Sequence, residues 1–303
     1  MSKPHFLMCR PDHYNVDYVI NPWMKGNLNR PNQTKAQIEW NAFAGALREK
    51  AVVSAIPQTT GLPDMVFAAN GAFVLNNIAT VANYRHKERQ GESALYEAWL
   101  ESHGYVTKRI AASIAFEGAG DALHDSARSI IWAAWGFRSD VESHAPLAEI
   151  YGVRVVSLHL VDERFYHLDT CFAPLDSGHV LYFPEAFDAE SLKRIEEIVP
   201  RSQRIIVSRE DAALFVCNAV EADGDIFVND CSHALEQRIA ATGLRLRRSH
   251  LSQFLMAGGA NRCLTLRLDV AYQVDQTSRA DALQEDDQPI GEDVHAAGEK
   301  ASR

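Results

Sequence analysis

Hydrophobic positions recur with helical spacing in five segments of the chain, and a short apolar strand follows each of them. The predicted helices are Thr34–Glu49, Glu92–His103, Val141–Tyr151, Asp188–Val199 and Ser232–Thr242. Four of these helices end at a glycine or a proline, which terminates a helix before the strand begins. Helix starts recur at roughly 45 to 55 residues, a period typical of a repeated supersecondary unit.

Pairs of further strands follow in several repeats and predict hairpins. The predicted pairs are Met65–Leu75 with Ala79–Tyr84, Phe165–Pro174 with His179–Pro184, and Leu214–Val220 with Asp225–Val228. Repeats of this kind stacked around an axis form an α/β propeller. The alternative is a doubly wound parallel sheet, but such a fold has single strands where this chain has hairpins, and no GxGxxG motif follows the first strand.

The end of the chain differs in composition from the rest. Residues 276–303 are polar, poor in aromatic residues and without periodicity, which predicts a disordered tail. Residues 1–275 are therefore expected to form a single catalytic domain.

One cysteine stands between a glycine-rich turn and an alternating apolar segment. Gly258 and Gly259 precede Cys263, and in the following segment 264–269 leucines alternate with polar residues, which predicts a strand. A thiol at the mouth of a strand can be held rigidly, next to backbone N–H groups of the turn. The alternative is a buried cysteine that serves as a small hydrophobic residue. Cys171 is a rival nucleophile, but it falls within a predicted strand and is interpreted as a core residue.

Acids and a base fall at comparable places in other repeats. Asp64, Glu117, and His167 with Asp169 each follow a short apolar run, at strand positions expected to face a common axis with Cys263. A thiol with an ordinary pKa is only a few per cent ionised at neutral pH, so it needs such a neighbour. His167 is the best candidate, with Glu117 to hold its second ring nitrogen. Taken one at a time, a core histidine and a turn glutamate are equally ordinary interpretations.

Composition and charge restrict the partners. The chain has a formal net charge of −10, which argues against nucleic-acid or membrane surfaces and suits a small cationic substrate. No segment is long and apolar enough for a membrane span or a secretory signal, so a cytoplasmic enzyme is expected. The five cysteines are scattered without metal-binding spacing, and no cofactor motif is present, so we expect neither a metal nor a cofactor. The sequence leaves homo-oligomer formation open.

Four motifs carry a resemblance to a known family: PDMVFAAN, FEGAGD, FYHLDTCF and GGANRCLTL. In this order they resemble the guanidine-modifying enzymes, the pentein or amidinotransferase superfamily, over nearly the whole chain. Arginine dihydrolase of cyanobacterial type and dimethylargininase-like hydrolases are the most similar members. The resemblance implies a five-bladed α/β propeller with pseudo-fivefold repeats and an active site at its centre.

The resemblance also implies covalent catalysis by a cysteine. Cys263 would attack the guanidinium carbon and form a thiouronium intermediate that water then hydrolyses. His167 would transfer the protons and Glu117 would orient it, while Asp64 and Asp169 would clamp the guanidinium N–H groups.

Four further residues are implicated in substrate binding by the same resemblance. Arg89 and Arg138 are expected to bind the α-carboxylate, and Asn21 lies in a loop that resembles a mobile entrance segment. Asn70 stands where dimethylargininases usually carry an acid, and its amide suits a urea as well as a guanidinium.

These residues favour one reaction. An arginine dihydrolase that releases ornithine, carbon dioxide and two ammonia is expected. The alternatives are a dimethylarginine dimethylaminohydrolase or an arginine deiminase, both giving citrulline, and then an amidinotransferase or a non-catalytic arginine-binding propeller.

Overall fold

The computed structural model describes residues 3–271, and the predicted tail at 276–303 lies outside these residues. The strands of the described part form five three-stranded sheets of the same design. The first sheet combines β15 (Leu266–Arg267), β1 (His5–Cys9) and β2 (Val52–Ile56). The others are β3 (Ala72–Leu75), β4 (Ile78–Val81) and β5 (Val106–Lys108); β6 (Ala122–Asp125), β7 (Ile130–Trp135) and β8 (Val155–His159); β9 (Phe172–Pro174), β10 (Val180–Tyr182) and β11 (Arg204–Ile206); and β12 (Val220–Ala222), β13 (Asp225–Val228) and β14 (Arg245–Arg248).

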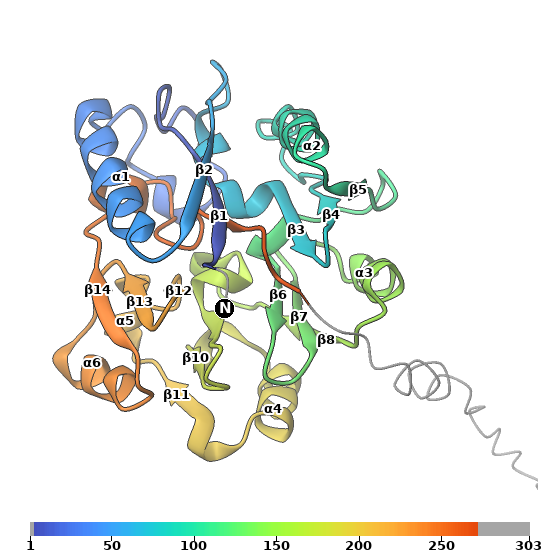
Figure 1. Cartoon of the computed structure of the whole chain (residues 1–303), viewed down its shortest axis with the longest axis vertical. Helices are drawn as coiled ribbons and strands as arrows, with labels where there is room; N and C mark the ends of the chain where they lie inside the picture. Colours follow the sequence, from blue (N-terminus) through green and yellow to red (C-terminus); the bar gives the residue numbers. More distant parts are fainter. Residues whose placement is uncertain (1–2, 272–303) are drawn as a thin grey trace, which may run out of the picture. The chain divides into compact units, whose positions relative to one another are not determined.

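Each sheet is built around a middle strand that is antiparallel to one neighbour and parallel to the other. A helix connects the middle strand to its parallel neighbour, as a parallel crossover requires. These helices are α1 (Gln33–Arg48), α2 (Glu92–Ser102), α3 (His144–Tyr151), α4 (Ala189–Ile198) and α6 (His233–Ala240). Figure 1 shows the five sheets following one another around the middle of the view, with these helices outside them.

All five predicted helices are confirmed to within a few residues. The alternative fold, one doubly wound sheet, is wrong, because the strands form five separate sheets. Two short helices, α5 (Arg209–Ala213) and α7 (Ser252–Leu255), were not predicted. A single helical turn is too short to present a periodic apolar face, so its sequence carries little signal.

The first sheet joins the two ends of the described chain. Strand β15 pairs antiparallel with β1, with Phe6 opposite Arg267 and Leu7 opposite Leu266. In every other sheet the corresponding strand comes from the same repeat as its partners. The antiparallel strand of the first repeat is therefore supplied by the far end of the sequence, three residues after Cys263.

Several predicted strands begin later than expected. Met65–Gly71 forms most of two 3-10 turns, η2 (Pro63–Val66) and η3 (Ala68–Gly71), and only the last residues of Met65–Leu75 become β3. Likewise η7 (Leu168–Thr170) precedes β9, and β12 starts only at Val220. Apolar side chains in these turns are buried just as those of a strand are, which is why their sequence looks like one. The expected placement of the polar residues on strands is therefore wrong.

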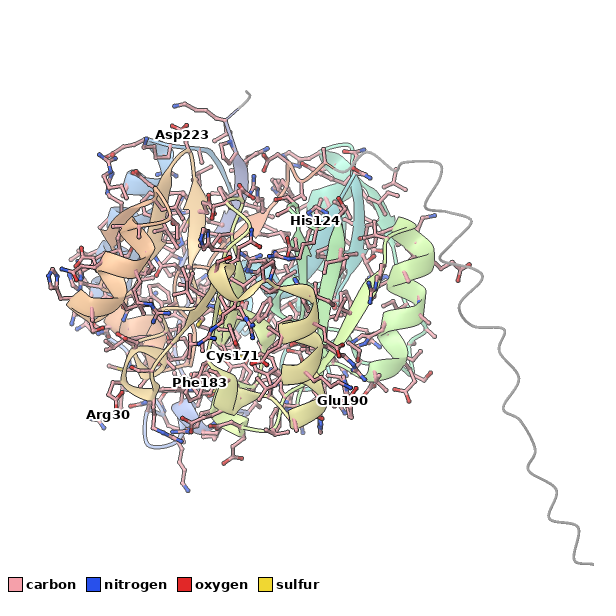
Figure 2. The ribbon with its side chains drawn as sticks, turned by 90° about the horizontal axis from the view of Figure 1, so that it is seen from below. Arg30, His124, Cys171, Phe183, Glu190 and Asp223 are labelled. Atoms are coloured by element: carbon pink, nitrogen blue, oxygen red, sulfur yellow. The ribbon has the colours of Figure 1, made fainter. Side chains whose placement is uncertain are left out.

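The core lies between the sheets and the helices. One apolar cluster extends over the third to fifth sheets and contains Cys171, and another surrounds α1 and contains Cys263. Figure 2 shows Cys171 in the interior of the molecule, whereas Arg30 and Asp223 lie at its edge. Burial raises the pKa of the Cys171 thiol well above its ordinary value, which is consistent with a core role. Within residues 3–271, no helix has the length and hydropathy needed to cross a membrane.

Candidate active site

Most of the predicted site residues lie in the turns that precede the antiparallel outer strand of each sheet, whereas Arg89, Arg138 and Asn21 lie between a middle strand and its helix. Glu117 is five residues before Ala122, where β6 begins, and His167 is five residues before Phe172, where β9 begins. Asn70 precedes the start of β3 by two residues, at Ala72, and Cys263 precedes the start of β15 by three, at Leu266. Equivalent turns of successive repeats thus bring residues from distant parts of the sequence to one place.

The Cys263 thiol is buried, with 2% of the residue exposed, and has two hydrogen-bond partners. Its Sγ lies 3.1 Å from Asn218 Nδ2 and 3.3 Å from Asp169 Oδ2. Asn218 Oδ1 also accepts the backbone N–H groups of Ala260 and Cys263, each at 3.1 Å. One amide side chain therefore fixes both the turn and the sulfur that it carries.

Asn218 was missed in the sequence. It lies two residues before β12, the same offset that Asn70 has before β3, so the repeat register was the signal that could have found it. Its Nδ2 also donates to the backbone carbonyl of Asp169 at 3.0 Å. Asn218 thus links the turns that carry the thiol and the aspartate.

The two glycines before the thiol stand at positions where a side chain would not fit. Gly258 adopts φ +83°, and a Cβ there would lie 2.9 Å from Trp23 and 3.0 Å from the Tyr166 hydroxyl. A Cβ on Gly259 would lie 2.4 Å from the Phe67 ring. Both positions exclude a larger residue, the first also because of its left-handed conformation.

The thiol and its acidic neighbour share a site that disfavours negative charge. Burial, and then the charge of Asp169, raise the pKa of the Cys263 thiol well above its ordinary value. Burial also raises the pKa of Asp169 to about 7, although Arg262 and the hydrogen bonds from Cys263 and Asn218 oppose this. In the unliganded protein the sulfur is therefore a thiol that donates to Asp169.

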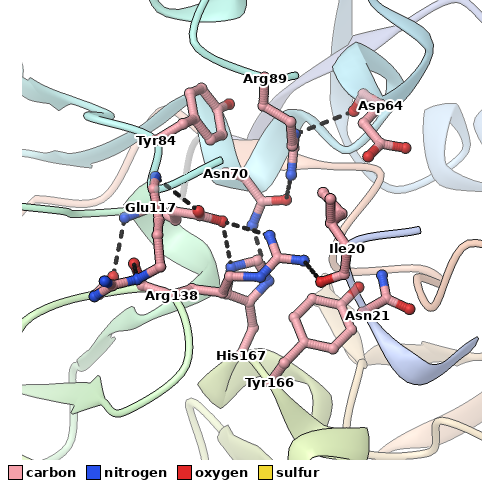
Figure 3. A network of polar contacts seen from close by, with 12 residues as sticks. Ile20, Asn21, Asp64, Asn70, Tyr84, Arg89, Glu117, Arg138, Tyr166 and His167 are labelled. Carbon is pink, nitrogen blue, oxygen red and sulfur yellow. Dashed lines mark hydrogen bonds and ion pairs between the residues drawn. The ribbon is translucent and has the colours of Figure 1, made fainter. Parts of the chain in front are cut away.

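His167 is held by Glu117. The imidazole Nε2 lies 2.8 Å from Glu117 Oε2, and Nδ1 lies 3.5 Å from Asn70 Nδ2 (Figure 3). An ionised carboxylate only accepts hydrogen bonds, so Nε2 carries a hydrogen and Nδ1 is the nitrogen left to exchange a proton. The thiol's own hydrogen bonds go to Asn218 and Asp169, not to this imidazole.

Glu117 stays ionised in spite of its burial. Burial favours the neutral acid, but the Arg138 guanidinium at 3.0 Å and the His167 hydrogen bond outweigh it and hold the pKa of Glu117 well below its usual range. Asp121, unpredicted but within the FEGAGD motif, accepts from Ser139 Oγ at 2.7 Å and from the Leu168 N–H at 3.1 Å. It connects the turn of Glu117 with the turn of His167.

The two predicted carboxylate-binding arginines have different surroundings. Arg89 is buried, with Nε and an Nη each 2.8 Å from the Glu92 carboxylate, and it also donates to Asn70 Oδ1 at 2.8 Å. Arg138 donates to Glu117 and to the backbone carbonyl of Ile20 at 3.0 Å, and its guanidinium stacks over the Tyr166 ring. Glu92, an ion-pair partner that the sequence did not reveal, thus takes two of the five N–H donors of Arg89.

The remaining predicted residues, Asp64 and Asn21, are buried and hydrogen-bonded. Asp64 Oδ2 accepts the Tyr18 hydroxyl at 3.1 Å, and Asn21 donates to the Ala257 carbonyl at 3.0 Å while its Oδ1 caps η1 (Pro22–Met24). Asn21 is therefore placed as a link between the entrance loop and the turn before Cys263. Burial raises the pKa of Asp64, opposed by Arg89 and by the Tyr18 hydrogen bond.

Two buried carboxylate oxygens in this site have no partner among residues 3–271: Asp64 Oδ1 and Asp169 Oδ1. An unpaired buried acceptor is costly, so these two oxygens define a place where N–H donors of a ligand would be stabilising. No group of three or more His, Cys, Asp or Glu residues in the described part of the chain is arranged to hold a metal ion.

The site contains a buried thiol, an imidazole–carboxylate pair and carboxylate oxygens without N–H donors. These groups are suited to the chemistry of a guanidine-modifying enzyme. The sequence matches the family described as N,N dimethylarginine dimethylhydrolase, eukaryotic, over residues 10–269, and the chain belongs to this family.

Among individual relatives, the bifunctional arginine dihydrolase/ornithine cyclodeaminase ArgZ of Synechocystis is 47% identical over 262 residues, which cover 86% of this chain and 37% of the relative. The chain thus spans well under half of that bifunctional protein. The N(G),N(G)-dimethylarginine dimethylaminohydrolase of Mycobacterium tuberculosis is 37% identical over 265 residues, 87% of this chain and 85% of that one.

The crystal structure of the N-terminal domain of ArgZ, a cyanobacterial arginine dihydrolase, was solved as a cysteine-to-serine mutant bound to substrate. It superposes with TM-score 0.88 at 46% identity, covering 88% of this chain and 99% of that domain.

Proposed function

We propose that the protein is an arginine dihydrolase that converts L-arginine and two waters into ornithine, carbon dioxide and two ammonia. The observation that carries this proposal is the pair of unpaired buried oxygens, Asp64 Oδ1 and Asp169 Oδ1, in the site of the Cys263 thiol. A guanidinium supplies planar N–H donors and a positive charge, which both oxygens need. The similarity to the ArgZ domain, crystallised with its substrate, supports arginine as the ligand.

Substrate binding would activate the nucleophile. The resting thiol is protonated because burial and the Asp169 charge disfavour a thiolate. A guanidinium cation bound between the two aspartates reverses that electrostatic balance and lowers the pKa of the thiol. Cys263 Sγ then bonds to the guanidinium carbon as the thiol proton passes to Nδ1 of His167.

His167 would carry the protons. With Nε2–H held by Glu117, Nδ1 delivers a proton to the departing nitrogen, so the C–N bond breaks and ammonia leaves. Nδ1 then accepts a proton from the water that displaces the sulfur, which gives citrulline. Asn70 Nδ2 lies 3.5 Å from this nitrogen, and its amide can hold the urea of citrulline for a second attack by the thiol. The second round releases another ammonia, and the carbamate that forms breaks down to carbon dioxide and ornithine.

The amino-acid end of the substrate would be bound beside the entrance loop. Both arginines are already paired, but Arg138 is better placed than Arg89 to receive a carboxylate, because it donates once to Glu117 and also contacts the Ile20 carbonyl, whereas Arg89 donates twice to Glu92. We further propose that the five repeats close into a five-bladed propeller, with these turns around its axis. The extent of the catalytic domain, residues 1–275, stays a prediction.

A product assay tests this function. Purified protein incubated with L-arginine is expected to yield ornithine and two ammonia per arginine consumed, as measured by mass spectrometry and an ammonia assay. Citrulline that accumulates without ornithine would contradict the dihydrolase reaction and leave a deiminase.

A second candidate is supported by the family match and by the mycobacterial relative, which are both named for dimethylarginine. Its substrate carries a dimethylated nitrogen without a hydrogen, so a carboxylate that faces this nitrogen would find no N–H donor, whereas every guanidinium nitrogen of arginine offers one. Dimethylamine released from asymmetric dimethylarginine faster than ammonia from arginine would favour this activity.

A further inference from the structure

A cavity lies in the described part of the chain, and none of the site residues discussed above lines it. Its volume is about 370 Å³, and its lining comes from several repeats. Phe6, Phe73, Val74 and Leu175 contribute apolar walls, and His124, labelled in Figure 2, marks the wall formed by β6. Arg262, the chain neighbour of the nucleophile Cys263, also faces this cavity.

Some of the charges in this cavity are already paired. Arg267 lies 3.3 Å from Asp269 and 3.6 Å from Asp176 in two ion pairs. Asp269 also accepts the backbone N–H of His5 at 3.0 Å. This cation is therefore already paired within the protein, and the group of three keeps one net negative charge.

Two lining groups of opposite sign lack such a partner. No hydrogen bond or ion pair joins the guanidinium of Arg262 to another residue of the range 3–271, and its main charge interaction is with Asp169. Glu221 accepts one backbone N–H, from Asp176 at 2.9 Å, and interacts with the charge of Arg267, but it forms no ion pair among residues 3–271. A partly buried charge without a counter-ion is unfavourable unless a ligand supplies one.

We propose that this cavity binds a zwitterionic α-amino acid, with the ligand carboxylate on Arg262, the ammonium group at Glu221 and the side chain against the apolar walls. A simple anion would satisfy Arg262 but not Glu221, and a simple cation the reverse. A ligand with both charges can pair with both groups, because Arg262 and Glu221 line the same cavity. Such a ligand would share Arg262 with Asp169, which accepts a hydrogen bond from the Cys263 thiol. Its charge would therefore act on the nucleophile from the side of this cavity.

The test uses L-leucine as the probe, because it has both charges and an apolar side chain but no guanidinium for the active site. Isothermal titration of the full-length protein is expected to show saturable binding of L-leucine below roughly 10 mM, a weak affinity. The matched probes are 4-methylpentanoate, which lacks the ammonium group, and 3-methylbutylamine, which lacks the carboxylate. Each is expected to bind about tenfold more weakly, or worse, because one charged hydrogen bond is lost.

Variants locate the bound ligand. Glu221→Gln keeps the size of the side chain and the acceptor for the Asp176 N–H, and it is expected to weaken leucine binding about tenfold. Asp64→Asn alters only the active site and is expected to leave leucine binding unchanged, as is Glu149→Gln on α3. Absence of saturable binding, equal binding of 4-methylpentanoate, or loss of binding in Asp64→Asn but not in Glu221→Gln would each overturn the proposal.

Discussion

At the residue scale, the site keeps its nucleophile protonated by placing it beside an acid. Asp169 accepts from the Cys263 thiol, and both groups are buried, so neither ionises readily. Glu117 is the opposite case, because Arg138 and His167 keep it ionised. Two carboxylates in one site thus differ in charge state for reasons that lie in their neighbours.

Replacing Asp169 tests this account. The pKa of Asp169 is raised to about 7, so its ionised form destabilises the folded state increasingly as pH rises from about 4 to about 7, and constantly above. Asp169→Asn is therefore expected to be more stable than the wild type at pH 8, by roughly 1–3 kcal/mol, with no such gain near pH 4. Hydrolysis of arginine should fall by roughly a hundredfold or more, since one clamp is lost. Denaturant unfolding at both pH values checks the first expectation; equal stability changes at pH 4 and pH 8 would refute it.

Asn218 is expected to act on catalysis through the thiol. Asn218→Ala removes the hydrogen bonds to Sγ and to two backbone N–H groups, so kcat is expected to fall by roughly tenfold to a hundredfold with a loss of about 1–3 kcal/mol in stability. Asn229→Ala is the control, because Asn229 is also buried and bonds two backbone groups, at Leu214 and Leu251, away from the thiol. If both variants lost kcat equally, the specific role of Asn218 would be disproved.

At the scale of elements, the working parts are short turns in front of strands. Each repeat contributes one such turn, and the strand that follows fixes where the turn ends. The turn before β15 is tightly constrained, because Gly258 combines a left-handed backbone with close contacts to Trp23 and Tyr166. A turn held in this way delivers the thiol at one position rather than over a range of positions.

Gly258→Ala is expected to displace the nucleophile. The new Cβ would meet Trp23 and Tyr166 in addition to the strain of φ +83°, so we expect a loss of roughly 2–4 kcal/mol in stability and at least a tenfold loss in kcat. Gly243→Ala serves as the matched control: φ is +91° there, but nothing lies within 4 Å of the added Cβ. Measured by thermal unfolding and by initial rates, the control should show only a stability loss of about 1 kcal/mol. Unchanged kcat in Gly258→Ala would refute the constraint.

At the scale of the whole molecule, the sheet of β15, β1 and β2 joins the two ends of the described chain. Leu266 in β15 is 1% exposed and lies opposite Leu7, and Cys263 is three residues before it. Stability and activity therefore depend on the same strand, because the strand that completes the first sheet also ends the turn of the nucleophile.

Leu266→Ala is expected to reduce both the stability and the activity of the protein. Removing this buried side chain should cost about 2–5 kcal/mol in the free energy of unfolding and lower the rate of arginine hydrolysis. Val106→Ala, on the outer strand β5 where Val106 is 52% exposed, should change stability by no more than about 0.5 kcal/mol. Urea unfolding followed by circular dichroism compares them. Similar losses in the two variants would count against this closure of the chain.

Much of the fold could be predicted from local pattern. The five long helices and their following strands repeat with a clear period, and helix ends are marked by glycine or proline. The turns η2, η3 and η7 could not be predicted, because an irregular apolar segment that is buried on all sides has a sequence like that of a strand. For the same reason Asn218 went unnoticed: its three partners, Asp169, Ala260 and Cys263, are all at least 42 residues away in the sequence.

By itself the sequence determined which residue types are available and how often the structural unit repeats, since both depend on neighbours along the chain. Only the tertiary structure decided how the site residues are paired. The thiol pairs with Asp169 and Asn218, the imidazole with Glu117, and Arg89 with the Glu92 carboxylate rather than being left for a substrate. Hydrogen bonds and charge interactions act over a few ångströms, so they depend on which turns the folded sheets bring together. For the thiol and the imidazole, whose partners are at least 45 residues away in the sequence, distance along the chain does not indicate the pairing.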